Sequence, residues 1–321
     1  MTKTAERQVT ARGDDFGLPY SKGLMASRIM ATGLSPARAF HVAEVVERRL
    51  QAAGSTAAAA VTGAELVDLV LEVLRGEEGE RYATSFAKWQ RVMQLDVPLV
   101  VLIGGAPGVG KSTIATQLAN RLGITRVIPT DAIREVMRAM FSADLMPTLH
   151  TSSFDAARLV RHPLPRSADP VLIGFGEQAS AVAVGVEALI SRAVVEGTDL
   201  IVEGAHVVPG FLDKDRLAGQ AVVVQVVVTV DDEDLHRNHL LVRAHEVRNR
   251  PSDRYVEFFA NIRKQQKYVK SLALQHGVAI IPSTNLDVTL TRVIDLVFNQ
   301  AIEAVPQQSV APTAASKRGA R

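Results

Sequence analysis

The stretch Leu99-Val-Val-Leu-Ile103 runs without a break into Gly104-Gly-Ala-Pro-Gly-Val-Gly-Lys-Ser-Thr113. Five consecutive apolar residues bounded by proline and glycine predict a strand that is buried on both faces, as in parallel sheets. The glycines that follow favour a tight loop, because residues without a Cβ let the backbone itself contact a ligand. Residues 112–122 have the pattern of a helix that begins at this loop. The stretch therefore predicts a strand, a glycine-rich loop and a helix, in that order.

The spacing of the loop residues indicates what the loop binds. Gly105, four further residues and then Gly110, Lys111 and Ser112 match the loop whose backbone N–H groups surround polyphosphate oxygens. In such a loop Lys111 reaches the β- and γ-phosphates and the Ser112 hydroxyl binds Mg²⁺. The alternative is a glycine-rich turn that binds nothing, and the helix that begins at the loop argues against it. We therefore predict a nucleoside triphosphate site with Mg²⁺, made by Gly105, Gly108, Gly110, Lys111, Ser112 and Thr113.

Composition narrows the class of protein. The chain has 321 residues, 47% of them apolar and 22% charged, which is typical of a globular protein with two domains or one large domain and an appendage. There is no cysteine, so disulfides, thiolate zinc sites and cysteine nucleophiles are excluded. The longest strongly apolar run, residues 221–230, is too short to span a bilayer, and residues 1–12 lack the apolar core of a signal peptide. We expect a cytoplasmic protein that does not act at a membrane.

Residues 1–92 have the pattern of a small helical domain. Helices are predicted over residues 21–32, 35–52, 64–74 and 80–93. By periodicity alone, these helices would form a cap that packs on the rest of the chain.

In residues 93–304, strands and helices alternate, which favours an α/β domain with a five-stranded parallel sheet and a substrate site at the carboxyl ends of its strands. Strands are predicted at residues 99–103, 125–129, 200–203, 221–230 and 277–282. Helices are predicted at residues 112–122, 132–140, 179–196, 233–272 with a break near Pro251, and 289–302. Residues 141–178, rich in proline, are predicted to be largely irregular, and the composition of residues 305–321 predicts a disordered tail.

Three polar residues follow predicted strands and are candidates for chemistry. Asp131 follows the second strand, where it either orients and deprotonates an acceptor hydroxyl or, together with Thr130, caps the next helix. Glu203 ends the third strand and is predicted to hold Mg²⁺, the alternative being an exposed loop carboxylate. His206 either contacts a substrate phosphate or packs and hydrogen-bonds locally.

Arginines gather in two parts of the chain. The group between Arg243 and Arg254 is predicted to form a lid over the transferring phosphate, with Arg248, Arg250 and Arg254 as its central residues and Arg250 as a catalytic one. For any one of these arginines a solvated helix face is the alternative. A second group is predicted to bind an anionic acceptor and comprises Arg134, Arg138 and Arg161.

The N-terminal region resembles the ATP-cone, a small helical regulatory module that binds nucleotide. The matching features are the opening pair Val9 and Arg12, the segment Pro19-Tyr-Ser-Lys22, and the closing pattern Arg81-Tyr-Ala83, Phe86 and Trp89. The resemblance implies a domain that senses nucleotide. Fold likeness alone does not establish that activity.

The chain as a whole resembles the 2-phosphoglycerate kinases, on motifs that cover nearly all of it except the tail. These are the glycine-rich loop, Pro129-Thr-Asp-Ala-Ile-Arg-Glu135, Leu149-His-Thr-Ser-Ser-Phe154, Val202-Glu-Gly-Ala-His206 with Pro209-Gly210, and Arg250-Pro251 with Arg254-Tyr255. The resemblance implies a P-loop kinase with sheet order 2-3-1-4-5 that uses ATP and Mg²⁺. It implies transfer of the γ-phosphate to the 3-hydroxyl of 2-phosphoglycerate, giving 2,3-bisphosphoglycerate. Lys111, Asp131, Glu203 and Arg250 would be catalytic, and the substrate would be bound by Arg134, Arg138, His150, Ser153, His206 and Arg254.

Three other functions are weighed against this one. The first is a kinase for another small phosphorylated or carboxylated metabolite. The second is an ATP-dependent regulatory switch without an acceptor, which leaves Asp131 and the arginine groups unexplained. The third is a nucleic-acid end kinase, which the net charge of +2 and the 5% aromatic content disfavour, because strand-binding grooves combine basic tracks with stacking rings. We therefore expect a small anionic substrate and no nucleic-acid partner.

Overall fold

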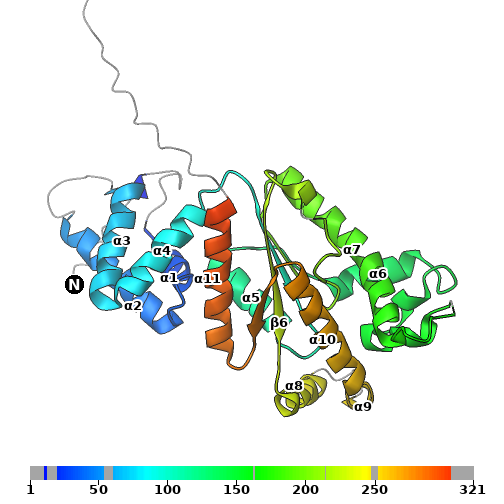
Figure 1. Ribbon diagram of the computed structural model, residues 1–321. Coiled ribbons are helices and arrows are strands. Elements are labelled where there is room, and N and C mark those ends of the chain that lie inside the picture. Colours follow the sequence, from blue (N-terminus) through cyan, green and yellow to red (C-terminus); the bar gives the residue numbers. More distant parts are fainter. Residues whose placement is uncertain are drawn as a thin grey trace, which may run out of the picture.

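The computed structural model describes residues 11–12, 20–53, 61–161, 163–213, 215–246 and 252–304. Its centre is a five-stranded sheet in which every neighbouring pair of strands is parallel, as Figure 1 shows. The strands are β3 (Leu99–Gly104), β4 (Val127–Pro129), β5 (Leu200–Glu203), β6 (Val222–Thr229) and β7 (Ala279–Pro282). Their order in the sheet is β4-β5-β3-β6-β7, so the predicted parallel sheet and its order 2-3-1-4-5 are confirmed.

The central strand is β3, and all six of its residues are buried. It pairs with β5 on one side, where Ile103 is in register with Glu203, and with β6 on the other, where Gly104 is in register with Val227. The loop that follows β3 therefore leaves the middle of the sheet at its carboxyl edge. This is where the glycine-rich loop can meet the ends of β5 and β6.

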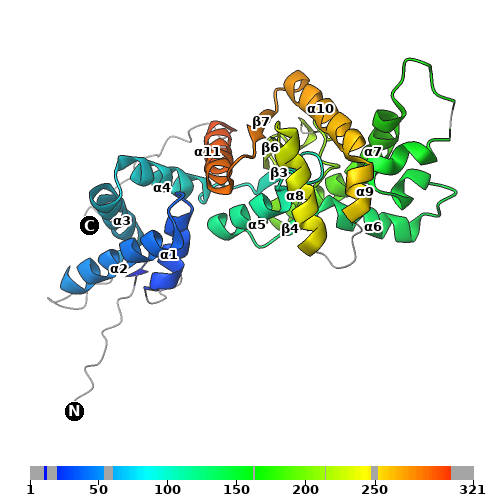
Figure 2. The same cartoon turned by 90° about the horizontal axis from the view of Figure 1, so that it is seen from below.

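Helices cover both faces of the sheet (Figures 1 and 2). Val101 and Ile103 of β3 belong to a core shared with α5 (Lys111–Leu122) and α11 (Leu286–Ala304). Val100 and Leu102 point to the opposite face, where their core is shared with α7 (Pro170–Glu196). The helices that complete the domain are α6 (Thr130–Met140), α8 (Glu233–Glu246), α9 (Ser252–Glu257) and α10 (Phe259–Gln275). Short 3₁₀ helices are η1 (Pro147–His150), η2 (Ser153–Leu159) and η3 (Asp215–Leu217).

The N-terminal region is helical, as predicted. Its helices are α1 (Lys22–Met30), α2 (Pro36–Ala53), α3 (Gly63–Glu77) and α4 (Glu80–Val92). It also contains a short parallel pair that the sequence did not predict, β1 (Ala11–Arg12) with β2 (Val61–Thr62). Two residues of the ATP-cone pattern, Val9 and Pro19, lie outside the described residues.

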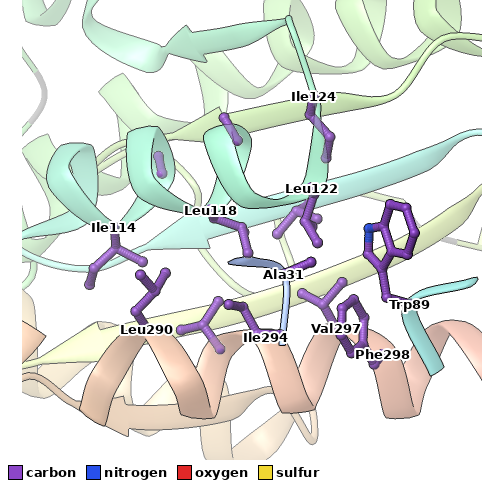
Figure 3. Close-up of a cluster of buried hydrophobic side chains, with 14 of the residues drawn as sticks. Ala31, Trp89, Ile114, Leu118, Leu122, Ile124, Leu290, Ile294, Val297 and Phe298 are labelled. Atoms are coloured by element: carbon purple, nitrogen blue, oxygen red, sulfur yellow. The ribbon is translucent and has the colours of Figure 1, made fainter. Parts of the chain in front are cut away.

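The N-terminal helices pack on α11 and α5 through a continuous apolar core. Figure 3 shows Trp89 of α4 beside Val297 and Phe298 of α11, with Ala31 close to Leu122 of α5. At the edge of this contact, Lys88 donates a hydrogen bond of 2.9 Å to Asn299. The N-terminal region thus rests directly on the helix that begins at the glycine-rich loop.

Helix α7 begins nine residues earlier than predicted, at Pro170 rather than at residue 179. The prediction included Pro170 in the proline-rich segment 141–178, but proline is well suited to the first position of a helix, where no backbone N–H donor is needed. Asp169 caps the helix by accepting a hydrogen bond of 2.9 Å from the backbone N–H of Val171. The segment predicted to be irregular therefore ends at residue 169 and contains η1 and η2.

Among the described residues, α7 is the one helix long and apolar enough to cross a membrane by length and composition. Its side chains Val182, Val186 and Ile190 are instead buried in the core beneath β3 and β5. This packing is that of a core helix.

Two glycines of α7 differ in their surroundings and give a matched test of how closely α7 and η2 approach. A Cβ at Gly174 would lie 2.6 Å from the carbonyl carbon of Ala156 in η2, whereas a Cβ at Gly176 would have no neighbour within 4 Å. We expect Gly174→Ala to lower the free energy of unfolding by about 1–3 kcal/mol, because backbone atoms must move apart. Gly176→Ala should raise it by about 0.5–1 kcal/mol, because alanine favours the helix. Denaturant unfolding measures both changes, and equal effects of the two substitutions would contradict the close contact.

Candidate active site

The glycine-rich loop has the backbone that a phosphate-binding loop requires. Gly105, Gly108 and Gly110 have φ angles of 139°, 84° and 88°, a region that residues with a Cβ rarely adopt. A Cβ at Gly105 would in addition lie 2.3 Å from the carbonyl oxygen of Val228 in β6. The buried side chain of Lys111 lies under this loop, and its Nζ donates a hydrogen bond of 2.8 Å to the Ala106 carbonyl. The loop is thus held between β6 and Lys111.

Ser112 at the start of α5 and Glu203 at the end of β5, the two residues predicted to hold Mg²⁺, lie side by side. The Ser112 Oγ donates a hydrogen bond of 2.8 Å to Glu203 Oε1, and the Glu203 side chain is buried. Mg²⁺ prefers oxygen ligands and keeps several waters and substrate phosphate oxygens, so a hydroxyl and a carboxylate are a fitting protein donor set. Within the described residues, no cluster of three or more His, Asp or Glu is placed to hold a metal ion. The fit of Ser112 and Glu203 to Mg²⁺ rests on their two oxygen donors and on the 2.8 Å between them.

A cavity of about 240 Å³ lies at the carboxyl end of the sheet. Its walls come from the loop after β3 with the start of α5, the end of β4 with the first turns of α6, the end of β5 with the residues after it, η2 with the residue before it, and α9. Seven of the predicted site residues line it together: Lys111, Ser112, Asp131, Arg134, Ser153, Glu203 and Arg254. It combines three cationic side chains with two carboxylates, which suits a small anionic ligand next to a metal ion.

A second cavity, of about 490 Å³, lies on the other side of the loop. Gly108, Gly110 and Thr113 line it together with residues of α8, of the segment after β7 and of the start of α11, namely His239, Val242, Ser283, Thr284 and Leu286. Lys111 and Ser112 line both cavities. The loop therefore lies between a larger, more apolar chamber and a smaller, charged one.

Asp131 is not the cap of the helix in which it lies. The cap position of α6 is Pro129, and no side chain makes a capping hydrogen bond there. Asp131 instead lines the smaller cavity, and Arg134 Nε lies 3.6 Å from its Oδ1. The carboxylate is thus directed to the cavity, and the helix-cap alternative for Thr130 or Asp131 is wrong.

Arg134 uses its guanidinium largely to hold the neighbouring loop. Its Nη1 donates hydrogen bonds of 2.8 Å to the Leu149 carbonyl and 3.3 Å to the Thr151 carbonyl. It therefore fixes the segment that leads into Ser153, while one side of it lines the cavity.

Three other predicted residues do not line the smaller cavity. Arg138 forms an ion pair of 2.5 Å with Glu135, and His150 Nε2 contacts the Phe141 carbonyl at 2.9 Å. Arg161 donates to the Ala143 carbonyl at 2.9 Å. Arg248 and Arg250 lie outside the described residues, as does the side chain of Arg243.

His206 lies behind the cavity wall in a buried chain of hydrogen bonds, which is the second of the two roles predicted for it. Its Nδ1 is 2.9 Å from Thr130 Oγ1 and its Nε2 is 2.9 Å from Gln178 Oε1. The Gln178 amide nitrogen donates to the carbonyls of Thr148 and Thr151, which directs its oxygen at His206. His206 therefore donates through Nε2 and accepts from Thr130 through Nδ1. The structure thus shows the local hydrogen bonding that was one alternative for His206, and these bonds link the ends of β4 and β5 to η1.

The His206 ring is neutral in this position. Burial lowers its pKa from 6.5 to about 4, and Asp131 opposes this shift while Arg134 and Lys111 add to it. A neutral ring fits the tautomer assigned above, because a protonated ring has no nitrogen to accept from Thr130.

A second buried histidine supports the glycine-rich loop from α8. His236 Nε2 donates a hydrogen bond of 2.7 Å to the Pro107 carbonyl, and its Nδ1 lies 3.3 Å from Arg263 Nη1 of α10. Arg263 also donates to the carbonyls of Val230 and Asp231 at the end of β6. No local pattern in the sequence indicates this support, because Pro107 and His236 are 129 residues apart.

Comparison with known proteins identifies the family. The chain is 39% identical over 283 residues to a 2-phosphoglycerate kinase of Methanothermobacter thermautotrophicus, covering 88% of this chain and 91% of that protein. It is 36% identical to that of Pyrococcus horikoshii and 34% identical to that of Pyrococcus furiosus, covering 95% and 98% of those proteins. The chain belongs to the 2-phosphoglycerate kinase family. No family model matches it.

Solved structures resemble the chain only in outline. A gluconokinase of Sinorhizobium meliloti and a shikimate kinase of Bacteroides thetaiotaomicron each superpose with a TM-score of 0.36 at 15% identity. They cover 65% and 62% of this chain, and 94% and 97% of their own. The assignment to the 2-phosphoglycerate kinase family rests on the sequence relatives alone.

The buried neutral His206 predicts a specific pH dependence of stability. The unfolded chain protonates this histidine below about pH 6.5, whereas the folded protein resists protonation down to about pH 4. Above pH 6.5 the histidine is neutral in both states and costs no stability. As the pH falls toward 4, protonation of the unfolded chain lowers the free energy of unfolding by up to about 3 kcal/mol. Denaturant unfolding of the unmodified protein and of His206→Asn is measured between pH 7 and pH 4.5. The difference between the two pH slopes gives the contribution of His206, because the two proteins share all other titratable groups. Identical pH slopes of the two proteins would contradict a buried neutral ring.

Proposed function

We propose that this chain transfers the γ-phosphate of ATP to the 3-hydroxyl of 2-phosphoglycerate, giving 2,3-bisphosphoglycerate and ADP. The observation that carries the proposal is that Lys111 and Ser112 line both cavities. A donor in the larger cavity would direct its terminal phosphate through the loop toward an acceptor in the smaller one. The relatives that cover most of the chain, each named 2-phosphoglycerate kinase, support this acceptor.

In the larger cavity, the walls suit a nucleoside. Val242 of α8 and Leu286 at the start of α11 offer apolar surface, and Ser283 and Thr284 offer hydroxyls. The backbone N–H groups of the loop would bind the phosphates, and the positive ammonium group of Lys111 would stabilise the charge on the transferring phosphoryl group. Ser112 and Glu203 would hold Mg²⁺, which neutralises charge on the donor phosphates when bound.

In the smaller cavity, we assign the acceptor hydroxyl to Asp131. The carboxylate would orient the hydroxyl and accept its proton as the new bond to phosphorus forms. An acceptor that carries a carboxylate and a phosphate needs several cations, and Arg134 and Arg254 supply them. Ser153 would add a hydroxyl donor. These roles rest on the position of each residue at the cavity and on charge complementarity.

We also propose the division of the chain that its sequence suggested, with a helical domain at residues 1–92, a kinase domain at residues 93–304 and a tail at residues 305–321. The end of α4 at Val92 and the start of β3 at Leu99 support the first boundary. Nucleotide binding by the helical domain and a cytoplasmic location remain predictions.

The acceptor is tested by incubating the purified protein with ATP, Mg²⁺ and a panel of phosphorylated three-carbon acids. ADP release and product mass are measured for each. We expect 2-phosphoglycerate to yield a bisphosphorylated product, and Lys111→Ala to reduce its formation at least about a hundredfold because a cation at the transferring phosphate is lost. A product from another acid but not from 2-phosphoglycerate would refute the acceptor, and ADP release that no acid stimulates would favour a regulatory switch.

The role of Asp131 is tested by Asp131→Asn, which keeps the shape of the side chain and removes its charge. We expect kcat to fall about a hundredfold or more, since the acceptor hydroxyl loses its proton acceptor. The KM for ATP should be unchanged, because Asp131 does not line the larger cavity. Full activity of this variant would leave Asp131 with no role in the chemistry.

A further inference from the structure

Asp155 of η2 is a buried carboxylate to which neither the sequence patterns nor the proposed chemistry assign a role. Its side chain is only 8% exposed. Two arginines converge on it: Arg254 Nη2 donates a hydrogen bond of 2.9 Å to Oδ2, and Arg158 Nε lies 2.9 Å from Oδ1. Thr151 Oγ1 lies 3.4 Å from Oδ2, at the long end of a hydrogen bond. Because burying a charge is costly unless it is paired, this carboxylate depends on its arginine partners.

Of the two arginines, Arg254 is the one that also lines the smaller cavity. It lies on α9, a helix of six residues, and its side chain is 45% exposed. A long side chain with this exposure has many rotamers, and holding it in one of them costs conformational entropy. The bond to Asp155 fixes the guanidinium at the cavity wall in advance. A guanidinium has five N–H donors, so one bond to Asp155 leaves donors for an oxyanion in the cavity.

Asp155 itself is held by contacts that do not involve Arg254. Next to it, the Phe154 ring packs against Phe258 at a centroid distance of 5.6 Å, and the Phe154 carbonyl accepts a hydrogen bond of 2.9 Å from Asn261. The Ser153 carbonyl accepts a further bond of 2.7 Å from the buried Gln265. Two side chains of α10 therefore hold the backbone at the start of η2 by hydrogen bonds. In the pair, Asp155 is the fixed partner and Arg254 the positioned one.

We propose that Asp155 is a positioning residue that holds Arg254 at the acceptor cavity, so that Arg254 binds an anionic group of the acceptor. The inference rests on the proposed function, because it places the acceptor in the smaller cavity. Arg158 also pairs with Glu257, so Arg254 is the cation of this group that lines the cavity. A guanidinium there suits a phosphate or a carboxylate. Asp155 does not line the cavity, so its effect on the reaction passes through Arg254.

Steady-state kinetics of Asp155→Asn with 2-phosphoglycerate and ATP test the proposal. We expect the KM for 2-phosphoglycerate to rise about tenfold or more, which is the effect of weakening one charge-assisted contact. The KM for ATP should not change, because Asp155 and Arg254 do not line the larger cavity. The matched control is Glu257→Gln. This substitution removes a carboxylate that lies 3.3 Å from Arg158 Nη2, and it should leave both KM values unchanged.

A double substitution separates positioning from a general effect on the fold. In an Arg254→Ala background, adding Asp155→Asn should not raise the KM for 2-phosphoglycerate further, since both changes remove the same contact. A further rise there, or an unchanged KM in the single Asp155→Asn variant, would overturn the proposal. Should Asp155→Asn not fold, Asp155→Glu keeps the charge and moves the carboxylate by one methylene. An unchanged KM for 2-phosphoglycerate in that variant would equally overturn it.

Failure of the proposed function is distinguished by the unmodified protein. If it makes no bisphosphorylated product from 2-phosphoglycerate, the acceptor is wrong, and the positioning role is then measured by binding. Calorimetric titration with inorganic phosphate, with a non-hydrolysable ATP analogue and Mg²⁺ occupying the donor site, should give weaker binding to Asp155→Asn than to the unmodified protein. Equal affinities would overturn the positioning role whichever metabolite is the acceptor.

Discussion

The hydrogen bond from Ser112 to Glu203 joins the two segments on which the site depends. It is 2.8 Å long and connects the loop after β3 to the end of β5, two strands that are neighbours in the sheet. Because Ser112 lines both cavities and Glu203 lines the smaller one, this hydrogen bond lies where the two cavities meet. The same two oxygen-bearing side chains fit Mg²⁺, so the structural link and the proposed metal site are one feature. The sheet order brings them together, since it places β3 beside β5.

A close contact between the segment after β5 and the start of α6 determines where Asp131 lies. A Cβ at Gly204 would lie 1.7 Å from Thr130 Oγ1, so the segment after Glu203 can approach the start of α6 only as glycine. Thr130 in turn bonds to His206, and His206 bonds to Gln178 of α7. This chain of contacts crosses from the edge strand to the long helix behind the sheet. It places Asp131, the neighbour of Thr130, at the cavity wall without a capping role.

The sequence predicted what depends on local pattern and missed what depends on distant contacts. The apolar runs located the five strands, and the loop spacing located Lys111 and Ser112 at the point where two cavities meet. Helix α7 was predicted too short because Pro170 was included in the proline-rich irregular segment, although proline suits the first position of a helix. His236 and Asp155 gave no signal, since their partners Pro107 and Arg254 are 129 and 99 residues away. Residue type alone cannot tell a solvated charge from one that folding buries against such a partner.

Arg134 and Arg254 show how folding divides a group of like residues into different roles. The sequence placed both among the substrate-binding cations, and both line the smaller cavity. The Arg134 side chain is 14% exposed and donates to two backbone carbonyls, so much of its hydrogen-bonding capacity serves the loop before Ser153. Arg254 is 45% exposed and bonds to one buried carboxylate. A cation that is anchored at one side and accessible at the other can bind an anion at a lower entropic cost than an unanchored one. The strength of acceptor binding should therefore depend more on how firmly Arg254 is held than on how many arginines surround the cavity.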